Sequence, residues 1–274
     1  MIQLVAASLL DLLGYQFFQY ALIGGTIATL ACAWIGLFLV LRKEAMIVDG
    51  VAHTAFGGIA IGLFLGVAPL IPALAVSVLA VLAITYMRRK GLAQSDSAIA
   101  VMLALGFSTG LIVISLAGGF NVELFSYLFG SILTISQADL ILITGLSIFI
   151  IAFMTVFYKE LLAITFDEGS SRLTGIPVEA LALAFNLMVA VTIVVTIKII
   201  GIILVVALVV IPALSALQFR LSFRKTMLAS IIIGVVSMIS GLFLSAIYNV
   251  ATSGVIVFVA LGFFLALAAY NRLR

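Results

Sequence analysis

Apolar blocks of roughly 20 residues, separated by short polar breaks, constrain the fold of this 274-residue chain more than any other feature. A helix of that length crosses about 30 Å of hydrocarbon, and only helices and closed barrels satisfy every backbone hydrogen bond in lipid. The blocks are continuous and do not alternate, which excludes barrel strands. Charged residues make up only 8% of the chain, against about 25% in soluble domains. The sequence therefore predicts an all-α polytopic membrane protein, with a single transmembrane domain over residues 1–274.

Polar breaks divide the chain into about eight or nine transmembrane helices. The predicted spans are 18–41, 45–66, 70–87, 97–117, 138–158, 179–197, 200–217, 225–247 and 252–271. Residues 179–217 must hold two helices, because a single one would extend almost 60 Å, about twice the hydrocarbon thickness. The turn between the two is predicted at Lys198 to Gly201.

The basic residues predict the orientation, since they collect in cytoplasmic loops. With the N-terminus outside, all 13 lysines and arginines except Lys198 fall on the cytoplasmic side. The C-terminus is then cytoplasmic as well. Met1 to Leu13 has neither the basic region nor the cleavage site of a signal peptide, so we expect none.

Residues 121–136, "NVELFSYLFGSILTIS", are too short and too polar at their ends for a full span. Their aromatic content is typical of the membrane interface. We therefore expect a short interfacial or re-entrant helix on the outer side.

The longest cytoplasmic loop, residues 159–178, carries the signals of a short helix. Asp167, Glu168 and Ser170 suit a helix start, and Gly175 and Pro177 suit a stop. A short, structured, charged loop is a natural docking site for a soluble partner.

The stretch "MIVDGVAHTAFGGIAIG" at 46–62 places Asp49 four residues before His53, the chain's single histidine. Residues four apart share one helix face, about 6 Å apart at Cβ, so both side chains can address one ion. Counting helical rise from Arg42 predicts Asp49 about 10 Å and His53 about 16 Å into the membrane. The spacing also brings Gly57 near this face.

An aspartate and a histidine suit zinc, manganese or ferrous iron. One helix offers only two ligands, whereas a two-fold dimer supplies two Asp49 and two His53, with charge to balance a divalent cation. The alternative is that Asp49 bonds a neighbouring helix and His53 only packs. Ionisable groups deep in membranes are costly and usually functional, which favours the ion site.

Gly58, Gly62 and Gly66 repeat every four residues on the same predicted helix. Such a small-residue face admits another helix closely. Gly58 lies about 140° around from His53 at 100° per residue, so the helix can pack on one side and present the ligands on another.

Five stretches of the chain resemble the membrane permeases of ABC-type metal importers, which carry zinc, manganese or iron. They are "GLFLVLRKEAMIVDGVAHTAFGGIAIG" at 36–62, "SDSAIAVMLALGFSTGLIVISL" at 95–116, "LFSYLFGSIL" at 124–133, "FDEGSSRLTGIPV" at 166–178 and "IKIIGIILVVALVVIPALSA" at 197–216. One departure is Ala52, where many members have a serine before the histidine.

The resemblance implies a permease homodimer in the prokaryotic cytoplasmic (inner) membrane, with zinc as the favoured metal and Asp49 and His53 on its route. It also implies cytoplasmic ATPase subunits, which the 166–178 loop engages through Phe166, Asp167, Glu168, Gly175 and Pro177, and an extracytoplasmic metal-binding protein. The chain has no GxxxxGK[ST] phosphate loop, so we expect a transport subunit that is no enzyme itself.

Two other classes remain open at this point. A secondary carrier driven by an ion gradient needs further ionisable groups within the spans, and only Asp49 and His53 are predicted there. An intramembrane metalloenzyme needs about three protein ligands and a base, and the chain has no HExxH motif.

Cys32 is the single cysteine, which excludes an intrachain disulfide and favours a packing role. The basic residues are spread through short loops, which argues against nucleic acid as a partner. Besides membrane lipid and the transported metal, we expect no permanently bound cofactor.

Overall fold

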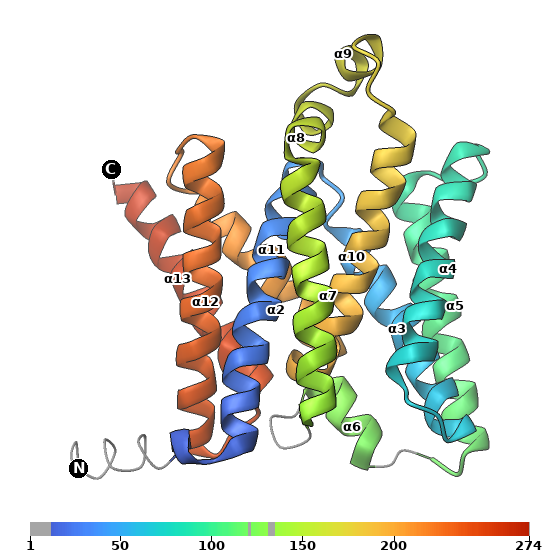
Figure 1. Ribbon diagram of the computed structural model, residues 1–274, viewed down its shortest axis with the longest axis vertical. Coiled ribbons are helices and arrows are strands. Elements are labelled where there is room, and N and C mark those ends of the chain that lie inside the picture. The colour runs from blue at the N-terminus through green and yellow to red at the C-terminus, as the bar shows by residue number, and fades with distance from the viewer. Residues whose placement is uncertain (1–11, 120–121, 131–134, 274) are drawn as a thin grey trace. The chain divides into compact units, whose positions relative to one another are not determined.

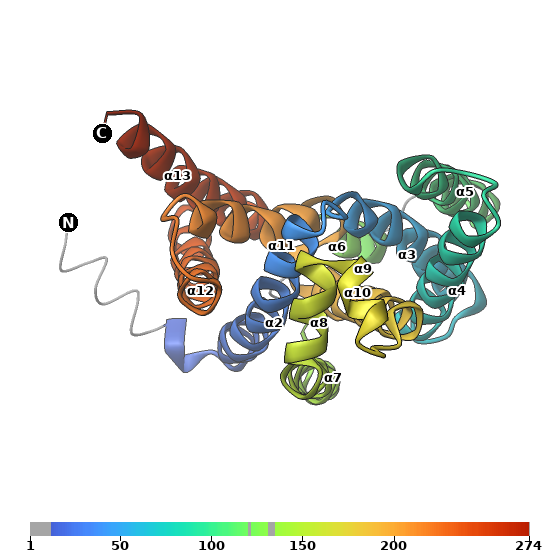
Figure 2. The ribbon, with the colours of Figure 1, turned by 90° about the horizontal axis from the view of Figure 1, so that it is seen from above.

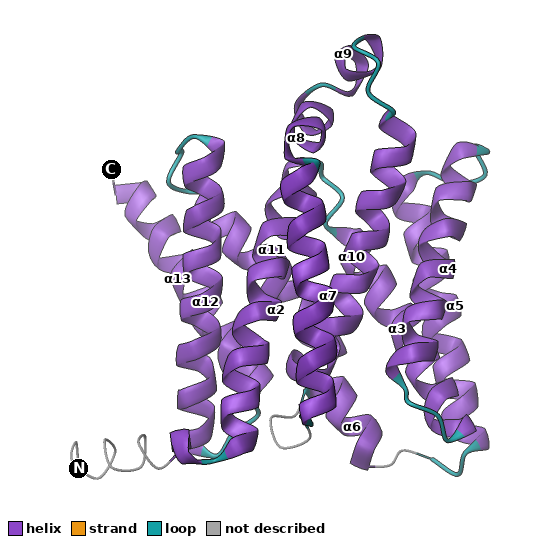
Figure 3. Cartoon of the chain, viewed as in Figure 1, coloured by secondary structure: helices purple, strands orange, loops and turns teal. Residues whose placement is uncertain are grey.

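The computed structural model describes residues 12–119, 122–130 and 135–273, all of whose regular elements are helices (Figure 3). The helices, labelled as in Figure 1, are α2 Gln16–Leu41, α3 Met46–Leu65, α4 Leu70–Arg89, α5 Ser95–Leu116, α6 Val122–Phe129, α7 Gln137–Val156, α8 Tyr158–Phe166, α9 Glu168–Leu173, α10 Val178–Ile200, α11 Ile202–Leu217, α12 Phe223–Tyr248 and α13 Thr252–Leu273. Most of the predicted start of the chain, Met1 to Leu13, lies outside the described residues, as do 121 and 131–134 of the predicted outer segment.

Eight of the described helices are long and apolar enough to cross a membrane, which confirms the predicted helical class and number of spans. They are α2, α3, α4, α5, α7, α10, α12 and α13. The remaining predicted span, 200–217, corresponds to α11, a shorter apolar helix of 16 residues. Two short helices, α8 and α9, occupy the predicted cytoplasmic loop, and α6 forms within the predicted outer segment.

The chain groups into two compact units. The first contains residues 1–37, 126–147 and 196–274, and the second contains 38–125 and 148–195. Four helices, α2, α6, α7 and α10, have residues in both units.

In the second unit, α3 packs against both α4 and α5 (Figures 1 and 2). Glycines permit the close approach to α5: a Cβ on Gly57 would lie 2.6 Å from the carbonyl oxygen of Gly106, and one on Gly106 would lie 2.4 Å from the Cα of Thr54. Small residues at crossing points let helices in lipid gain van der Waals contact and bring their backbones together. This packing fixes the helix that carries Asp49 and His53.

In the first unit, α11, α12 and α13 pack against one another, and α10 and α11 are separated by a break at Gly201. Gly201 has φ 87°, a backbone conformation that L side chains rarely adopt. A Cβ on Gly201 would lie 2.5 Å from the nitrogen of Gly130, so the end of α6 contacts the break backbone to backbone. The break predicted between Lys198 and Gly201 is confirmed.

The break also places a charged pair in the first unit. Lys198 Nζ lies 2.6 Å from Asp139 Oδ2 at the start of α7, and both side chains are mostly buried. The single basic residue predicted on the outer side thus has an acidic partner, at the start of the predicted span 138–158.

Candidate functional site

Asp49 and His53 form an open strip on an otherwise buried stretch of α3. From Ile47 to Ala60 they are the two residues that are not buried, with 34% of the Asp49 side chain and 27% of the His53 side chain exposed. His53 Nε2 lies 3.5 Å from Asp49 Oδ1. Two ligand atoms about 2.1 Å from one tetrahedral ion lie about 3.4 Å apart, so the pair can bind a single ion with little rearrangement.

The count of helical rise from Arg42, on which the predicted depth of this pair was based, does not hold, because residues 42–45 form a turn and not a helix. Lys43 has φ 58°, and α3 begins only at Met46. Counted from Met46, Asp49 lies about 4.5 Å and His53 about 10 Å along the helix. Asp49 is therefore in the first turn of α3, where the helix dipole stabilises a carboxylate by about 0.5 kcal/mol.

An aromatic pair holds the His53 ring. The ring of Phe107 on α5 meets His53 edge-on at 5.4 Å and stacks on Phe56 at 5.4 Å. His53 Nδ1 is buried without a hydrogen-bond partner. Nε2, which faces Asp49, is the nitrogen that lies nearest to a carboxylate oxygen.

The glycines of α3 serve three purposes. Gly58 and Gly62 lie against α4, where a Cβ would lie 2.5 Å from the Cα of Ala73 and 2.7 Å from the Cα of Pro69, respectively. Gly57 is buried against α5, so the open strip does not extend to it. Gly66 has a different role from the predicted packing: it ends the helix with φ 67° and has no atom within 4 Å of a built Cβ.

The strip supplies two ligands. Within the described ranges there is no group of three or more histidine, cysteine, aspartate or glutamate residues that could hold a metal ion.

The predicted coupling residues lie around α9. The Asp167 side chain caps this helix by accepting a hydrogen bond from the backbone nitrogen of Ser170 at 3.0 Å. Phe166 is 67% exposed and Leu173, at the other end of α9, is 91% exposed. Gly175 has φ 82° after the helix, and Pro177 directly precedes α10.

Local packing and charge hold this loop. Ile164, Val178 and Leu181 form a buried apolar cluster that joins α8 to α10. Hydrogen bonds from Ser170 lower the pKa of Asp167, and the Glu168 carboxylate raises the pKa of Arg172. Both groups are therefore charged at neutral pH.

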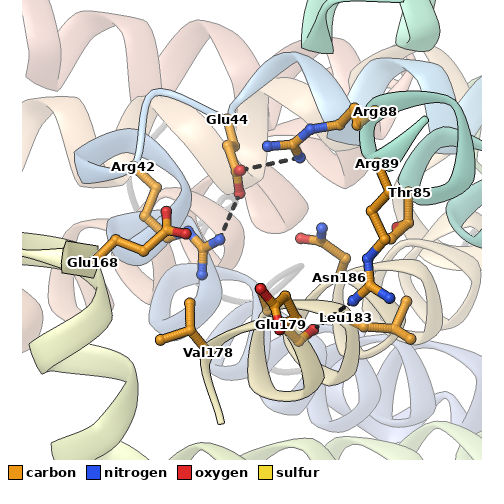
Figure 4. Close-up of a pocket in the computed structure, with 11 residues that line it drawn as sticks. Arg42, Glu44, Thr85, Arg88, Arg89, Glu168, Val178, Glu179, Leu183 and Asn186 are labelled. Atoms are coloured by element: carbon orange, nitrogen blue, oxygen red, sulfur yellow. Dashed lines mark hydrogen bonds and ion pairs between the residues drawn. The ribbon is translucent and has the colours of Figure 1, made fainter. Parts of the chain in front are cut away.

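A charged cleft of about 270 Å³ in the second unit was not predicted from the sequence (Figure 4). Arginines and glutamates from the α2–α3 turn, α4, α9 and α10 line it. The arginines that line it served, in the sequence, only to predict the orientation of the chain in the membrane. A signal that could have found it is an acidic residue close to a basic cluster, such as Glu44 two residues after Arg42.

Eight of the described helices are long and apolar enough to cross a membrane, and an exposed, capped helix, α9, lies in the chain between two of them. The model of the ABC 3 transport family matches residues 14–271. The chain therefore belongs to this family and is the membrane permease of an ABC transporter.

Relatives cover almost the whole chain. MntC, the manganese transport system membrane protein of Halalkalibacterium halodurans, is 32% identical over 91% of this chain and 86% of its own length. ZnuB, the high-affinity zinc uptake system membrane protein of Haemophilus influenzae, is 29% identical over 93% of this chain and 97% of its own length. The solved structure of PsaBC from Streptococcus pneumoniae in complex with Fab matches with TM-score 0.86 and 29% identity, covering 97% of this chain and 95% of that one.

Membership decides among the three predicted classes in favour of the ATP-driven permease. It also implies an ATPase and a binding protein as partners. The secondary carrier and the intramembrane metalloenzyme are not needed to account for the chain.

Proposed function

We propose that this permease imports a divalent transition-metal ion, manganese or zinc, which passes between Asp49 and His53. The observation that carries the proposal is the open strip on α3: one carboxylate oxygen and one imidazole nitrogen 3.5 Å apart on an otherwise buried stretch. Carboxylate and imidazole together bind both ions. The similarity to MntC, a manganese transport protein, and to ZnuB, a zinc uptake protein, supports the same two metals.

The metal route lies at the axis of a homodimer. Two side chains give half the ligands of a tetrahedral site, and the described residues offer no third ligand beside them. A second copy related by two-fold symmetry adds an identical pair. The two carboxylates then balance the charge of one divalent cation.

The ATPase docks on the cytoplasmic α9, and the N-terminus lies outside. Exposed Phe166 and Leu173 flank α9 and provide apolar contacts for a partner. Ion pairs that join the α2–α3 turn to α4, and α9 to α10, support one common side for these segments. The pairing of Lys198, in the last turn of α10, with Asp139, in the first turn of α7, supports a common side for these two helix ends.

Transport follows alternating access. The binding protein delivers the ion to the outer mouth, the two Asp49–His53 pairs bind it, and ATP-driven motion of α9 opens the route inward. Two ligands from each chain hold the ion without burying it in a closed cage, which suits release. No GxxxxGK[ST] loop is present in the sequence, so the phosphate chemistry belongs to the partner.

Replacing Asp49 tests the proposal. In proteoliposomes that contain the permease, its ATPase and its binding protein, Asp49→Ala should lower manganese or zinc uptake by about 100-fold or more, since even an outer-shell partner of a metal ligand contributes 10–100-fold. The assembled complex should be recovered in normal amounts. Unchanged uptake by an assembled Asp49→Ala transporter would rule out the assigned site.

Competition identifies the metal. Radioactive manganese uptake by the unaltered transporter is measured against excess unlabelled manganese, zinc or ferrous iron. The physiological ion should compete at the lowest concentration. No ATP-dependent uptake of any of the three ions would reject the metal class.

A further inference from the structure

The charged cleft is lined both by a residue next to the start of α3, the helix that carries Asp49 and His53, and by a residue of α9, the proposed ATPase-docking helix. It is lined by Glu44, immediately before α3, by the C-terminal end of α4, and by the start of α10 (Figure 4). Its volume is about 270 Å³. All of its lining residues belong to the second unit.

Glu44 lies between two arginines. Its carboxylate is 3.2 Å from Arg42 Nη2 and 3.3 Å from Arg88 Nη1. The side chains of Glu44 and Arg42 are 12% and 11% exposed, so solvent screens their attraction less than on an open surface. The Arg42 guanidinium also lies over the Phe185 ring of α10, 5.1 Å from its centroid. Glu44 therefore ties the beginning of α3 to α4 directly, and to α10 through Arg42.

The contacts continue to α9. Arg89, next to Arg88, donates a hydrogen bond to the Glu179 carbonyl at the start of α10, at 3.4 Å. Glu179 Oε1 lies 2.9 Å from Arg172 Nη1, and Arg172 Nη2 lies 2.8 Å from Glu168 Oε1. We call this set of contacts from Glu168 to Glu44 the arginine–glutamate chain. It connects α9 with a residue five positions before Asp49.

Two observations favour a mechanical role over a ligand site. Three arginines and three glutamates line the cleft, so the lining charges neutralise one another and do not select an ionic ligand. Three buried polar atoms on residues that line the cleft, Arg42 Nη1, Glu44 Oε2 and Asn186 Oδ1, have no hydrogen-bond partner, and Asn186 is only 4% exposed. In Figure 4 the Asn186 amide points into the cleft that Arg42 also lines.

A buried donor and a buried acceptor without partners cost free energy that a second arrangement recovers. Arg42 Nη1 is a donor, and Asn186 Oδ1 and Glu44 Oε2 are acceptors, so a narrower cleft can pair the donor with an acceptor. A second arrangement of this kind would make the cleft a two-state element, which coupling between distant sites requires.

We propose that Glu44 is a positioning residue, which sets the placement of α3, and with it the metal-binding pair, according to the position of α9. The arginine–glutamate chain transmits the movement of α9 to α3, and the cleft narrows when the ATPase moves α9. The inference rests on the proposed function, because it takes α9 as the ATPase-docking helix and Asp49 with His53 as the metal ligands.

The test compares uptake with ATP hydrolysis in the complete transporter. Glu44→Gln keeps the size of the side chain and removes its charge. We expect it to raise the number of ATP molecules hydrolysed per metal ion imported about fivefold, within the range of mutations that alter coupling between sites. Glu44→Asp, which keeps the charge, should restore most of the coupling. The control Lys225→Gln removes an exposed charge from the start of α12 and should change nothing.

A double-mutant cycle shows whether the pair acts as a unit. If Glu44 works through Arg88, adding Arg88→Gln to Glu44→Gln should weaken coupling little further, whereas independent effects would multiply. If Glu44→Gln fails to assemble, Arg88→Gln alone carries the same measurement, since it leaves the Arg42–Glu44 pair in place.

The outcomes separate this inference from the proposed function. Normal ATP use per ion in assembled Glu44→Gln and Arg88→Gln transporters would overturn the positioning role while leaving metal import intact. Absence of metal uptake by the unaltered transporter would instead overturn the proposed function. Uptake and ATP hydrolysis that fall in equal proportion would show a purely structural role and would also overturn the inference.

Discussion

The side chain of Asp167 stabilises the start of α9, the proposed docking helix. Its carboxylate caps α9, and hydrogen bonds from Ser170 lower its pKa below the ordinary value of about 3.9. A carboxyl group whose pKa is lower in the folded state contributes stability above its unfolded pKa. That contribution is lost as the pH falls through the folded pKa. The cap of α9 is therefore complete at neutral pH and fails only in strong acid.

Asp167→Ala should reduce metal uptake about fivefold, because α9 loses its N-terminal cap and frays. Asp167→Asn should retain most of the uptake, since asparagine caps helices as well as aspartate does. Uptake is measured in proteoliposomes with the complete transporter. If both variants lose activity equally, the charge and not the cap is what the ATPase requires.

Helices and their breaks were predictable from local properties of the sequence. Chain length forced the break before Gly201, and Asp167 and Ser170 marked the start of α9, because caps and turns act over a few residues. Contacts between distant residues were not predictable in this way. The pairing of Lys198 with Asp139 joins residues 59 positions apart, and the Glu44–Arg88 pair joins residues 44 apart.

The same distinction holds for the candidate site: features set by local spacing were predictable, and contacts between distant residues were not. The four-residue spacing of Asp49 and His53 predicted a shared face, and both residues lie on one strip of α3. The helical rise counted from Arg42 was wrong, because the turn at Lys43 interrupts the helix there, so the depth of the pair stays a prediction. The aromatic contact of Phe107 with His53 depends on how α5 crosses α3, which no local pattern reports.

At the level of elements, the α3–α4 contact depends on glycine at position 58. Gly58→Ala should destabilise the permease by up to about 2 kcal/mol, because the new Cβ would lie 2.5 Å from the Cα of Ala73 and overpacking usually costs about 1–3 kcal/mol. The gain in helix propensity, about 1 kcal/mol, offsets this only in part. The midpoint of thermal unfolding in detergent measures the change.

Gly145→Ala is the matched control for this prediction. Gly145 lies within α7, and a Cβ there meets no atom within 4 Å. The substitution should be neutral or slightly stabilising, by up to about 1 kcal/mol. Equal midpoints for Gly58→Ala and Gly145→Ala would mean that α4 moves away from α3 at no cost, contrary to the packing described.

At the level of the whole molecule, the metal site is incomplete in one chain. Asp49 and His53 supply one oxygen and one nitrogen ligand, and within the described ranges no cluster of three or more metal-binding side chains exists. The proposed homodimer completes the site by symmetry. In such a shared site, neither copy of the permease can transport metal without Asp49 and His53 of the other copy.

Co-expression of the unaltered chain with Asp49→Ala in equal amounts tests this dependence. Random pairing gives about one quarter unaltered dimers, one half mixed and one quarter doubly altered. If each dimer has one shared site, mixed dimers lack a ligand and ATP-dependent metal uptake should fall to about a quarter. If each chain has its own route, uptake should fall only to about a half, which would contradict the shared axis. Co-expression with Lys225→Gln, which alters an exposed residue at the start of α12, should leave uptake unchanged.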